Sequence, residues 1–349
     1  MNMETKKRFN KIEKFLLKKD FNGFTKEDLF IMTIIKKGWG QDIAALSHMA
    51  ESLVNLSIKN PKNNKQYQML LHQVVLRAIH PKVNPYKVNI FNVNKLGKYG
   101  YYLEHLNIII GCYLYLSKTY KYMKLNEKIS FHLLSNSNRY TNYHADLLPN
   151  VNMKWAADQA AILYSLWLYD QNNETDISSE LIKNWTSYMN SRATHKKTGL
   201  YITEVLNTRK YSNQPRGCSH SYMIHYMSRF DYKNAKNQWY LFKKHMMKKV
   251  FGRIGFREYL PNYNGNWSPD TGPIIAGCGV AATGLGLNAA SSVNDHEVFK
   301  GLSKTMSPFG SVFNIAESIV GNNLLTRIGT DLLASSIWLN AETKEKWFN

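Results

Sequence analysis

The stretch "MKWAADQAAILYSLWLYD", residues 153–170, says most about the fold of this chain. Between Trp155 and Leu168 nearly every side chain is apolar, and Asp158 is the single charged residue. A helix that is apolar on almost all sides belongs inside a protein. A buried carboxylate is costly unless it is hydrogen-bonded, paired or facing a cavity. We therefore predict a buried helix over 154–170 that carries Asp158 toward a partner or a cavity.

Helical periodicity continues on both sides of this stretch, and strand-like alternation is scarce. Short breaks rich in Asn, Pro, Gly and Ser separate the apolar periods. The predicted helices cover residues 26–36, 41–58, 64–79, 98–118, 121–137, 154–170, 177–191, 218–228, 232–247, 272–291, 294–304 and 327–340. About twelve helices, alternately more apolar and more charged, suggest six helical hairpins. The prediction is an all-α, (α/α)6 toroid forming a single domain over residues 1–349; an open helical solenoid is the alternative, although no fixed-period repeat is visible.

Two long passages interrupt the helical pattern. Residues 194–217 could hold a short hairpin, and residues 255–273 are dense in Pro, Gly, Asn and aromatic side chains. Long irregular loops in a compact helical chain are more often functional than accidental. We expect functional residues in both.

Composition limits the class of protein. The chain has 349 residues, 44% of them hydrophobic, which is enough for a substantial core. No apolar run reaches membrane-spanning length, the N-terminus lacks the apolar segment of a signal peptide, and the three cysteines form no CxxC pair. A cytoplasmic protein is the default expectation.

The formal net charge of +20 has two interpretations. It could mark a surface for nucleic acid or an anionic membrane. The lysines are scattered rather than gathered in an arginine-rich block, which favours an ordinary solvated surface. We expect a small-molecule substrate, no specific nucleic-acid partner, no transmembrane segment, and a homo-oligomer as one option.

Acid–base chemistry is the best candidate activity, because carboxylates and histidines occur in apolar or loop-end settings. The catalytic candidates are Asp158, His105, Asp270 and Glu258. Each also has a structural interpretation: Asp158 could hydrogen-bond a neighbouring helix, Asp270 could cap a helix beginning at "TGPII", and His105 could be a core histidine.

Five further residues are candidates for binding the substrate: Tyr101, Arg216, Ser219, Tyr259 and Trp267. Arg216, in "PRG", could bind an anionic group or pair with a buried carboxylate. No nucleotide-binding glycine motif, zinc motif or nucleophile elbow is present. No cofactor and no metal are expected.

Several motifs together resemble the linalool dehydratase/isomerase-like proteins. They are "YGYYLEHLNIIIG", "PNVNMKWAADQAAILYSLWLYDQ" followed by "THKKTGLY", "PRGCSHS" and "REYLPNYNGNWSPDTGPIIAGCG", in this order between residues 98 and 290. The resemblance implies an (α/α)6 barrel with a central active site and cofactor-independent chemistry on a terpene alcohol. In this comparison His105 matches the active-site histidine of the family. Asp158 stands at one of two catalytic cysteine positions, and the other falls near Pro149.

The predicted function is therefore a cofactor-independent acid–base enzyme, a lyase or isomerase that dehydrates, hydrates or isomerises an alcohol or alkene in a central cavity. Two alternatives stay open. Paired carboxylates across a helical toroid also suit a glycoside hydrolase or lyase. A non-catalytic helical scaffold with a basic surface is the other.

Overall fold

A computed structural model describes residues 1–33, 40–205, 214–250, 252–263, 265, 268, 270–306 and 331–348. Contacts between residues divide the chain into two compact units. Unit 1 comprises Met1–Asn152, Ala161–Lys183 and Asp331–Asn349, and unit 2 comprises Met153–Ala160 and Asn184–Thr330. Each unit is described below by itself.

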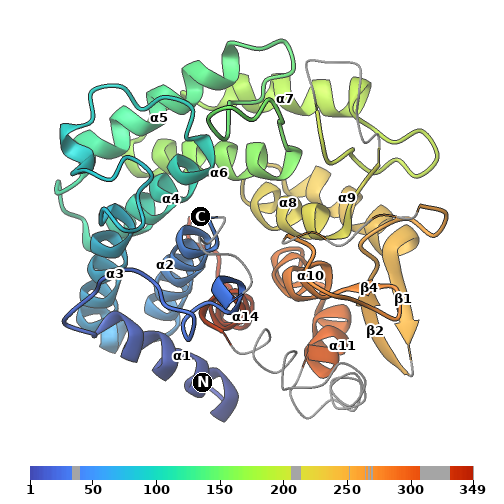
Figure 1. The fold of residues 1–349 in the computed structure, drawn as a ribbon, viewed down its shortest axis with the longest axis horizontal. Helices are drawn as coiled ribbons and strands as arrows, with labels where there is room; N and C mark the ends of the chain where they lie inside the picture. The colour runs from blue at the N-terminus through green and yellow to red at the C-terminus, as the bar shows by residue number, and fades with distance from the viewer. Residues whose placement is uncertain are drawn as a thin grey trace. The chain divides into compact units, whose positions relative to one another are not determined.

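The described part of the chain contains twelve α-helices and two short β-hairpins (Figure 1). The helices are α1 (Met3–Leu16), α2 (Gln41–Lys59), α3 (Asn64–Ile79), α4 (Gly100–Ser117), α5 (Met123–Asn138), α6 (Ala156–Asn173), α7 (Ser179–Arg192), α8 (Gly217–Phe230), α9 (Tyr232–Met246), α10 (Val280–Ser292), α11 (His296–Met306) and α14 (Leu332–Thr343). Short 3-10 helices are η1 (Phe30–Thr33), η2 (Pro61–Asn63) and η3 (Ile90–Asn92). The hairpins pair β1 (Met247–Val250) with β2 (Arg253–Phe256), and β3 (Ile274–Ile275) with β4 (Cys278–Gly279). The predicted all-α class is confirmed.

The core of unit 1 is built on α2 and α4, whose side chains are buried on nearly all sides. Helix α14 packs along α2, and α3 packs against both α2 and α4 (Figure 1). The Glu51 carboxylate of α2 is fully buried and accepts hydrogen bonds from the Tyr164 hydroxyl at 3.2 Å and the Asn340 amide at 2.7 Å. This polar contact joins α2, α6 and α14.

Helix α1 was missed by the sequence prediction. Its sequence is rich in charged residues, and an apolar stripe of Phe9, Ile12 and Leu16 lies between them. These three side chains are buried against the rest of unit 1. The Asn2 side chain caps its first turn, and Arg8 pairs with Glu342 of α14 at 2.8 Å. The stripe is therefore a normal amphipathic face with a lysine-rich outer side.

The helix predicted over 154–170 is confirmed as α6, with bounds shifted two to three residues later. Its chain belongs to unit 2 as far as Ala160 and to unit 1 from Ala161. In unit 1, α6 approaches α4 closely, because Gly111 leaves room for the Leu168 side chain. Asn107 of α4 also donates to the Ser165 hydroxyl at 3.1 Å, so this polar residue of α6 is accounted for by packing.

In unit 2, α8 and α10 lie side by side, and both hairpins lie next to α10 (Figure 1). Residues 272–291 were predicted as one helix, which is wrong: the β3–β4 hairpin comes first and α10 begins at Val280. The turn residues Ala276 and Gly277 both have positive φ, 49° and 78°, as a two-residue hairpin turn requires. The β-branched Ile274 and Ile275 before the turn also favour a strand over a helix.

Other boundaries also need correction. The helix predicted over 232–247 ends at Met246, and the chain continues as β1. The helix predicted over 26–36 is replaced by η1, with residues 34–39 outside the described part. In the described part of the possible hairpin at 194–217, Thr194 and Tyr201 form an isolated bridge, and residues 206–213 lie outside the described part. The predicted helix over 327–340 corresponds to α14, which begins after the cap Asp331.

Candidate functional site

Asp158 lies in the first turn of α6, where the side chain is almost completely buried at 7% exposure. The backbone N–H of Asp158 donates a hydrogen bond to its own carboxyl group. Burial raises the pKa of Asp158 to about 7, and the negative charge of Asp270 adds to this increase. Asp158 is therefore poised to hold or release a proton near neutral pH.

Thr203 connects the start of α6 to the loop that precedes α8. Its carbonyl oxygen accepts from the Ala156 N–H at 3.1 Å, and its hydroxyl oxygen accepts from the Arg216 N–H at 2.8 Å. A second backbone bond, from Val205 N–H to the Lys154 carbonyl, runs beside it. These bonds fix the turn that carries Asp158 relative to Arg216.

Arg216 and Glu258 form an ion pair that holds the loop after β2 against the start of α8. The Arg216 Nε donates to Glu258 Oε1 at 3.0 Å, and its Nη2 donates to the Ser268 hydroxyl at 3.1 Å. Glu258 is 1% exposed and also accepts from the Cys218 N–H at 3.1 Å and its thiol at 3.0 Å. Burial raises the pKa of Glu258, and its hydrogen bonds and Arg216 oppose the increase. We call Arg216, Cys218, Glu258 and Ser268 the arginine cradle.

Gly217 makes the close packing of this cradle possible. A Cβ atom at Gly217 would lie 2.0 Å from the Arg257 carbonyl oxygen and 2.8 Å from the Ala282 Cβ. The Gly217 N–H donates to the Glu258 carbonyl at 2.8 Å. The "PRG" motif thus places an arginine directly before a residue that must be small.

Asp270 lies in the loop before β3 and is exposed to solvent. Surrounding protein atoms raise the pKa of its carboxyl group, and the positive charge of Arg216 opposes that increase. The interpretation of Asp270 as a helix cap is wrong, because α10 begins at Val280 with Gly279 as its N-cap. The negative charge of Asp270 raises the pKa of Asp158, and the positive charge of Arg216 only partly offsets the increase at Asp270 itself.

Two tyrosines stand next to the cradle. The Tyr259 and Tyr263 rings are 5.4 Å apart, and the Arg216 guanidinium lies 5.7 Å from the Tyr259 ring centre. Tyr263 is 39% exposed. The Tyr259 ring packs over Gly265, where a Cβ would come within 2.1 Å of it. The loop therefore presents aromatic surface beside two carboxyl groups and an arginine.

His105 and Tyr101 belong to unit 1, where both lie on α4. Burial lowers the pKa of His105 to about 3, although the Glu51 carboxylate opposes this decrease. The imidazole is neutral at physiological pH, and its ring packs edge-on against Tyr101 with centroids 5.1 Å apart. These observations favour the core-histidine interpretation over a role as proton donor.

The remaining predicted residues are less informative. Ser219 lies on α8 and is half-buried. Trp267 lies outside the described residues. Sequence reasoning missed Thr203, Cys218 and Ser268, three small polar residues that position the others. The position of Cys218 directly after "PRG" was a signal that could have been used.

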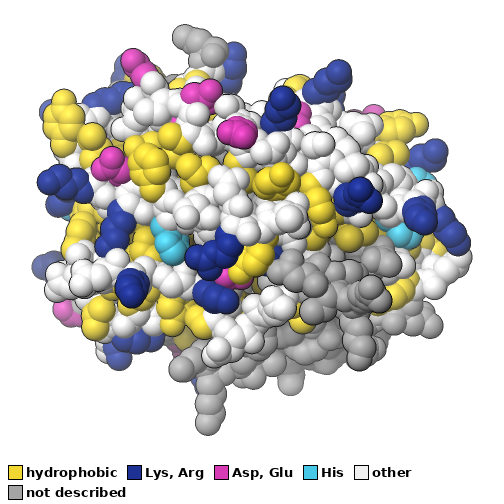
Figure 2. Space-filling model, turned by 90° about the horizontal axis from the view of Figure 1, so that it is seen from above, with side chains coloured by type: hydrophobic (Ala, Val, Ile, Leu, Met, Phe, Trp, Pro, Cys, Tyr) yellow, Lys and Arg dark blue, Asp and Glu magenta, His cyan; other side chains and the backbone are white. Residues whose placement is uncertain are grey.

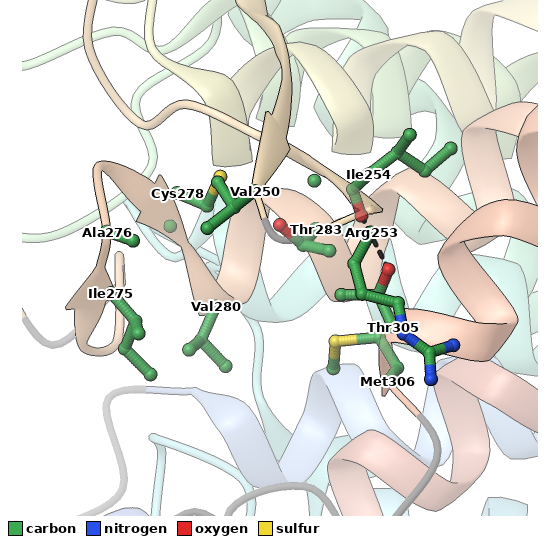
Figure 3. A pocket seen from close by; sticks show the side chains of 12 residues that line it. Val250, Arg253, Ile254, Ile275, Ala276, Cys278, Val280, Thr283, Thr305 and Met306 are labelled. Atoms are coloured by element: carbon green, nitrogen blue, oxygen red, sulfur yellow. Dashed lines mark hydrogen bonds between the residues drawn. The ribbon is translucent and has the colours of Figure 1, made fainter. Parts of the chain in front are cut away.

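A separate apolar pocket lies between the two hairpins and α10 and α11 (Figure 3). Val250, Ile254, Ile275, Val280 and Met306 are among its lining residues. None of the predicted site residues is among them, and its described lining contains no carboxylate. Gly279 lines the pocket and also lies against Glu258, since its Cβ would be 3.0 Å from Glu258 Oε2. The pocket therefore borders Glu258 through Gly279 but shares no side chain with the acid–base cluster.

A histidine and a carboxylate lie close together in the core of unit 1. Unit 1 by itself supplies His48 and Glu51, whose Nδ1 and Oε2 atoms are 3.8 Å apart. No helix in the described residues is both long and apolar enough to cross a membrane.

Comparison with known proteins gives a fold likeness and no family. No family model matches the chain, and no curated protein matches it. Among solved structures, it is similar to a family 76 glycoside hydrolase from a bovine Bacteroides thetaiotaomicron strain, with a TM-score of 0.53 and 10% sequence identity. The likeness covers 98% of this chain and 77% of the other. The fold is an α/α toroid, as predicted.

The resemblance to linalool dehydratase/isomerase-like proteins is wrong. The solved structure that the chain resembles over nearly its whole length is a glycoside hydrolase. The motifs that suggested the resemblance are short, and their apolar and aromatic residues serve helix packing here: "YGYYLEHLNIIIG" is the buried α4. The lyase or isomerase activity that was inferred from that resemblance is therefore not supported either.

Proposed function

We propose that this protein is a carbohydrate-active enzyme, a glycoside hydrolase that uses Asp158 and Asp270 as its two carboxyl groups. The observation that carries the proposal is a pair of carboxyl groups in different surroundings: burial raises the pKa of both, to about 7 at Asp158, and only at Asp270 does the Arg216 charge oppose the increase. Glycoside hydrolysis needs one carboxylic acid and one carboxylate on either side of the scissile bond. Pairs of carboxyl groups whose surroundings separate their pKa values have this division of roles.

In the proposed reaction, Asp158 donates its proton to the leaving glycosidic oxygen. Asp270, as the carboxylate, either attacks the anomeric carbon or removes a proton from the attacking water, and its spacing from Asp158 decides between the two. Asp158 lies in the first turn of α6, where the helix dipole stabilises the carboxylate left after proton transfer. Glu258 has no place in these steps, because its oxygens are occupied by Arg216 and Cys218.

The aromatic pair supports a sugar as substrate. Tyr259 and the exposed Tyr263 offer flat apolar faces with hydroxyl groups at their edges, which suits the apolar and polar faces of a sugar ring. The fold likeness to a glycoside hydrolase points in the same direction. A small apolar alcohol would need a closed apolar cavity at Asp158, and the described apolar pocket lies elsewhere.

The test is a screen of the purified protein against oligosaccharides and polysaccharides of different linkage, with reducing ends as readout. Asp158→Asn and Asp270→Asn are each expected to lower the rate by about 10²- to 10⁴-fold. Asp176→Asn, at an exposed aspartate, is the matched control and should keep wild-type activity. An Asp158→Asn variant as active as the control would overturn the proposal, and so would a folded wild type inactive on every glycan.

A further inference from the structure

The positive charge of the chain is concentrated in one stretch of unit 1. Residues 59–128, all of which the structure describes, contain 12 of the 45 Lys and Arg residues but only Glu104 and Glu127 of the 25 acidic residues. Glu104 and Arg77 are buried. The exposed charges of this stretch are therefore eleven lysines and one carboxylate, Glu127. The lysines therefore dominate the electrostatic potential of this surface.

The same stretch exposes large apolar side chains, which normally lie in a core. Tyr120 is 85% exposed, Val88 51%, Phe91 50% and Met69 49%, and Leu76 and Met123 are also exposed. Contiguous apolar surface of this kind marks an interaction site.

Side-chain contacts link the helices and the 3-10 helix that carry these exposed residues. Phe91 of η3 stacks on Tyr122, with centroids 6.1 Å apart, and His72 of α3 reaches the Tyr122 hydroxyl at 3.0 Å. Met69, His72 and Leu76 lie three and four residues apart on α3, so they share one helix face. Tyr122 thus joins the exposed stripe of α3 to η3 and to the start of α5.

Lysines surround this apolar surface. Lys121 lies over the Tyr122 ring at 5.3 Å and contacts His72 at 3.1 Å. Lys124 and Lys128 follow on the exposed side of α5, and Lys128 reaches back to the Val93 carbonyl beside η3. We call Met69, Leu76, Phe91, Tyr120, Met123 and these three lysines the α3–η3–α5 surface. On the face drawn in Figure 2, Lys and Arg likewise outnumber Asp and Glu, with hydrophobic side chains between them.

We propose that the α3–η3–α5 surface docks on a lipid bilayer that carries anionic headgroups. Aliphatic and aromatic side chains can enter the headgroup region while the surrounding lysines approach the lipid charges. A nucleic-acid surface is less consistent with these residues, because the cations are lysines without exposed arginine, and Met, Leu and Val add nothing to phosphate binding. This inference does not depend on the proposed catalytic activity.

The test is flotation of the full chain with vesicles of phosphatidylcholine alone or with about a third phosphatidylglycerol. We expect binding to the anionic vesicles that weakens as salt is raised and at least tenfold weaker binding to the neutral ones. Lys121→Gln, Lys124→Gln and Lys128→Gln together should lower the partition coefficient by on the order of 100-fold, about fivefold for each lysine. Tyr120→Ser, at a side chain so exposed that the fold does not depend on it, should also lower the partition coefficient.

The matched control replaces three exposed lysines of α9 in unit 2, Lys233→Gln, Lys236→Gln and Lys244→Gln, and should change binding less than twofold. Three results would overturn the proposal. They are equal binding to neutral and anionic vesicles, equal losses for the two triple variants, and lysine-dependent binding to heparin or single-stranded DNA without binding to vesicles.

Discussion

Asp158 in the first turn of α6 and Glu258 in the arginine cradle are both buried carboxyl groups of unit 2, yet their surroundings differ. Glu258 accepts from Arg216, from the Cys218 N–H and from the Cys218 thiol. Asp158 accepts a hydrogen bond from its own backbone N–H, and the negative charge of Asp270 acts on it. The comparison teaches that burial alone does not distinguish a structural carboxyl group from a reactive one. Arg216 and Cys218 hold Glu258 in a network of hydrogen bonds, whereas burial and the charge of Asp270 raise the pKa of Asp158 to about 7.

The largest effect on stability is expected at Glu258. Glu258→Gln leaves the mostly buried Arg216 without its carboxylate and should lower the free energy of unfolding by about 3 kcal/mol. Chemical denaturation near pH 7 measures this, with the exposed Glu297→Gln as control. A loss as small as the control's would mean that the ion pair does not hold the cradle.

Asp158→Asn should raise the free energy of unfolding at neutral and alkaline pH, the opposite of the effect of Glu258→Gln. The pKa of about 7 in the folded protein lies above the ordinary value, so the unfolded chain releases this proton at lower pH than the folded chain does. Wild-type stability therefore falls as pH rises from about 4 to 7 because of this group, and Asp158→Asn escapes that loss.

At pH 8 the Asp158→Asn variant should thus be more stable than the wild type by about 2–4 kcal/mol, while at pH 4 the difference should nearly vanish. Denaturation curves at both pH values give the result. Asp176→Asn should show no such pH dependence, and equal stability of Asp158→Asn and wild type at pH 8 would contradict the account.

Arg216→Lys tests the electrostatic link between the cradle and Asp270. A single ammonium cannot reproduce the two contacts of the guanidinium, to Glu258 and Ser268, and we expect a loss of about 2 kcal/mol. The pKa of Asp270 should rise as the guanidinium charge moves, which shifts the acidic limb of the pH–rate profile to higher pH. An unchanged acidic limb would place Asp270 outside the influence of Arg216.

Cys218→Ala should give the smallest change. It removes one thiol hydrogen bond to Glu258 while the backbone N–H bond and Arg216 remain. A loss of about 1 kcal/mol is expected from thermal unfolding. A loss as large as that of Glu258→Gln would show that the thiol, rather than the arginine, satisfies the carboxylate.

Much of the fold could be predicted from the sequence, because helical periodicity is a local signal. The buried α6 and its charged residue were identified from residues 153–170 alone. The β3–β4 hairpin was missed because its turn, Ala276–Gly277, lies inside an apolar run that reads equally well as a helix. Helix α1 was missed because lysines mask its three-residue apolar spacing.

The candidate site was only partly predictable. The sequence identified Asp158, Asp270, Glu258, Arg216 and Tyr259, and unit 2 contains all five. The sequence could not separate their roles. The hydrogen bonds that occupy the Glu258 carboxylate come from residues such as Cys218, which lies 40 positions earlier in the chain. Thr203 shows the same limit: no local pattern marks a hydroxyl whose partner is 13 residues away.

The most direct test of the central claim is a titration of the Asp158 carboxyl group in the folded protein. The infrared difference spectrum between wild type and Asp158→Asn isolates the band of the protonated acid as pH is raised. The account predicts that this band disappears with a midpoint near pH 7, and that Asp270→Asn lowers the midpoint by removing the neighbouring charge. A midpoint below pH 5 would contradict it.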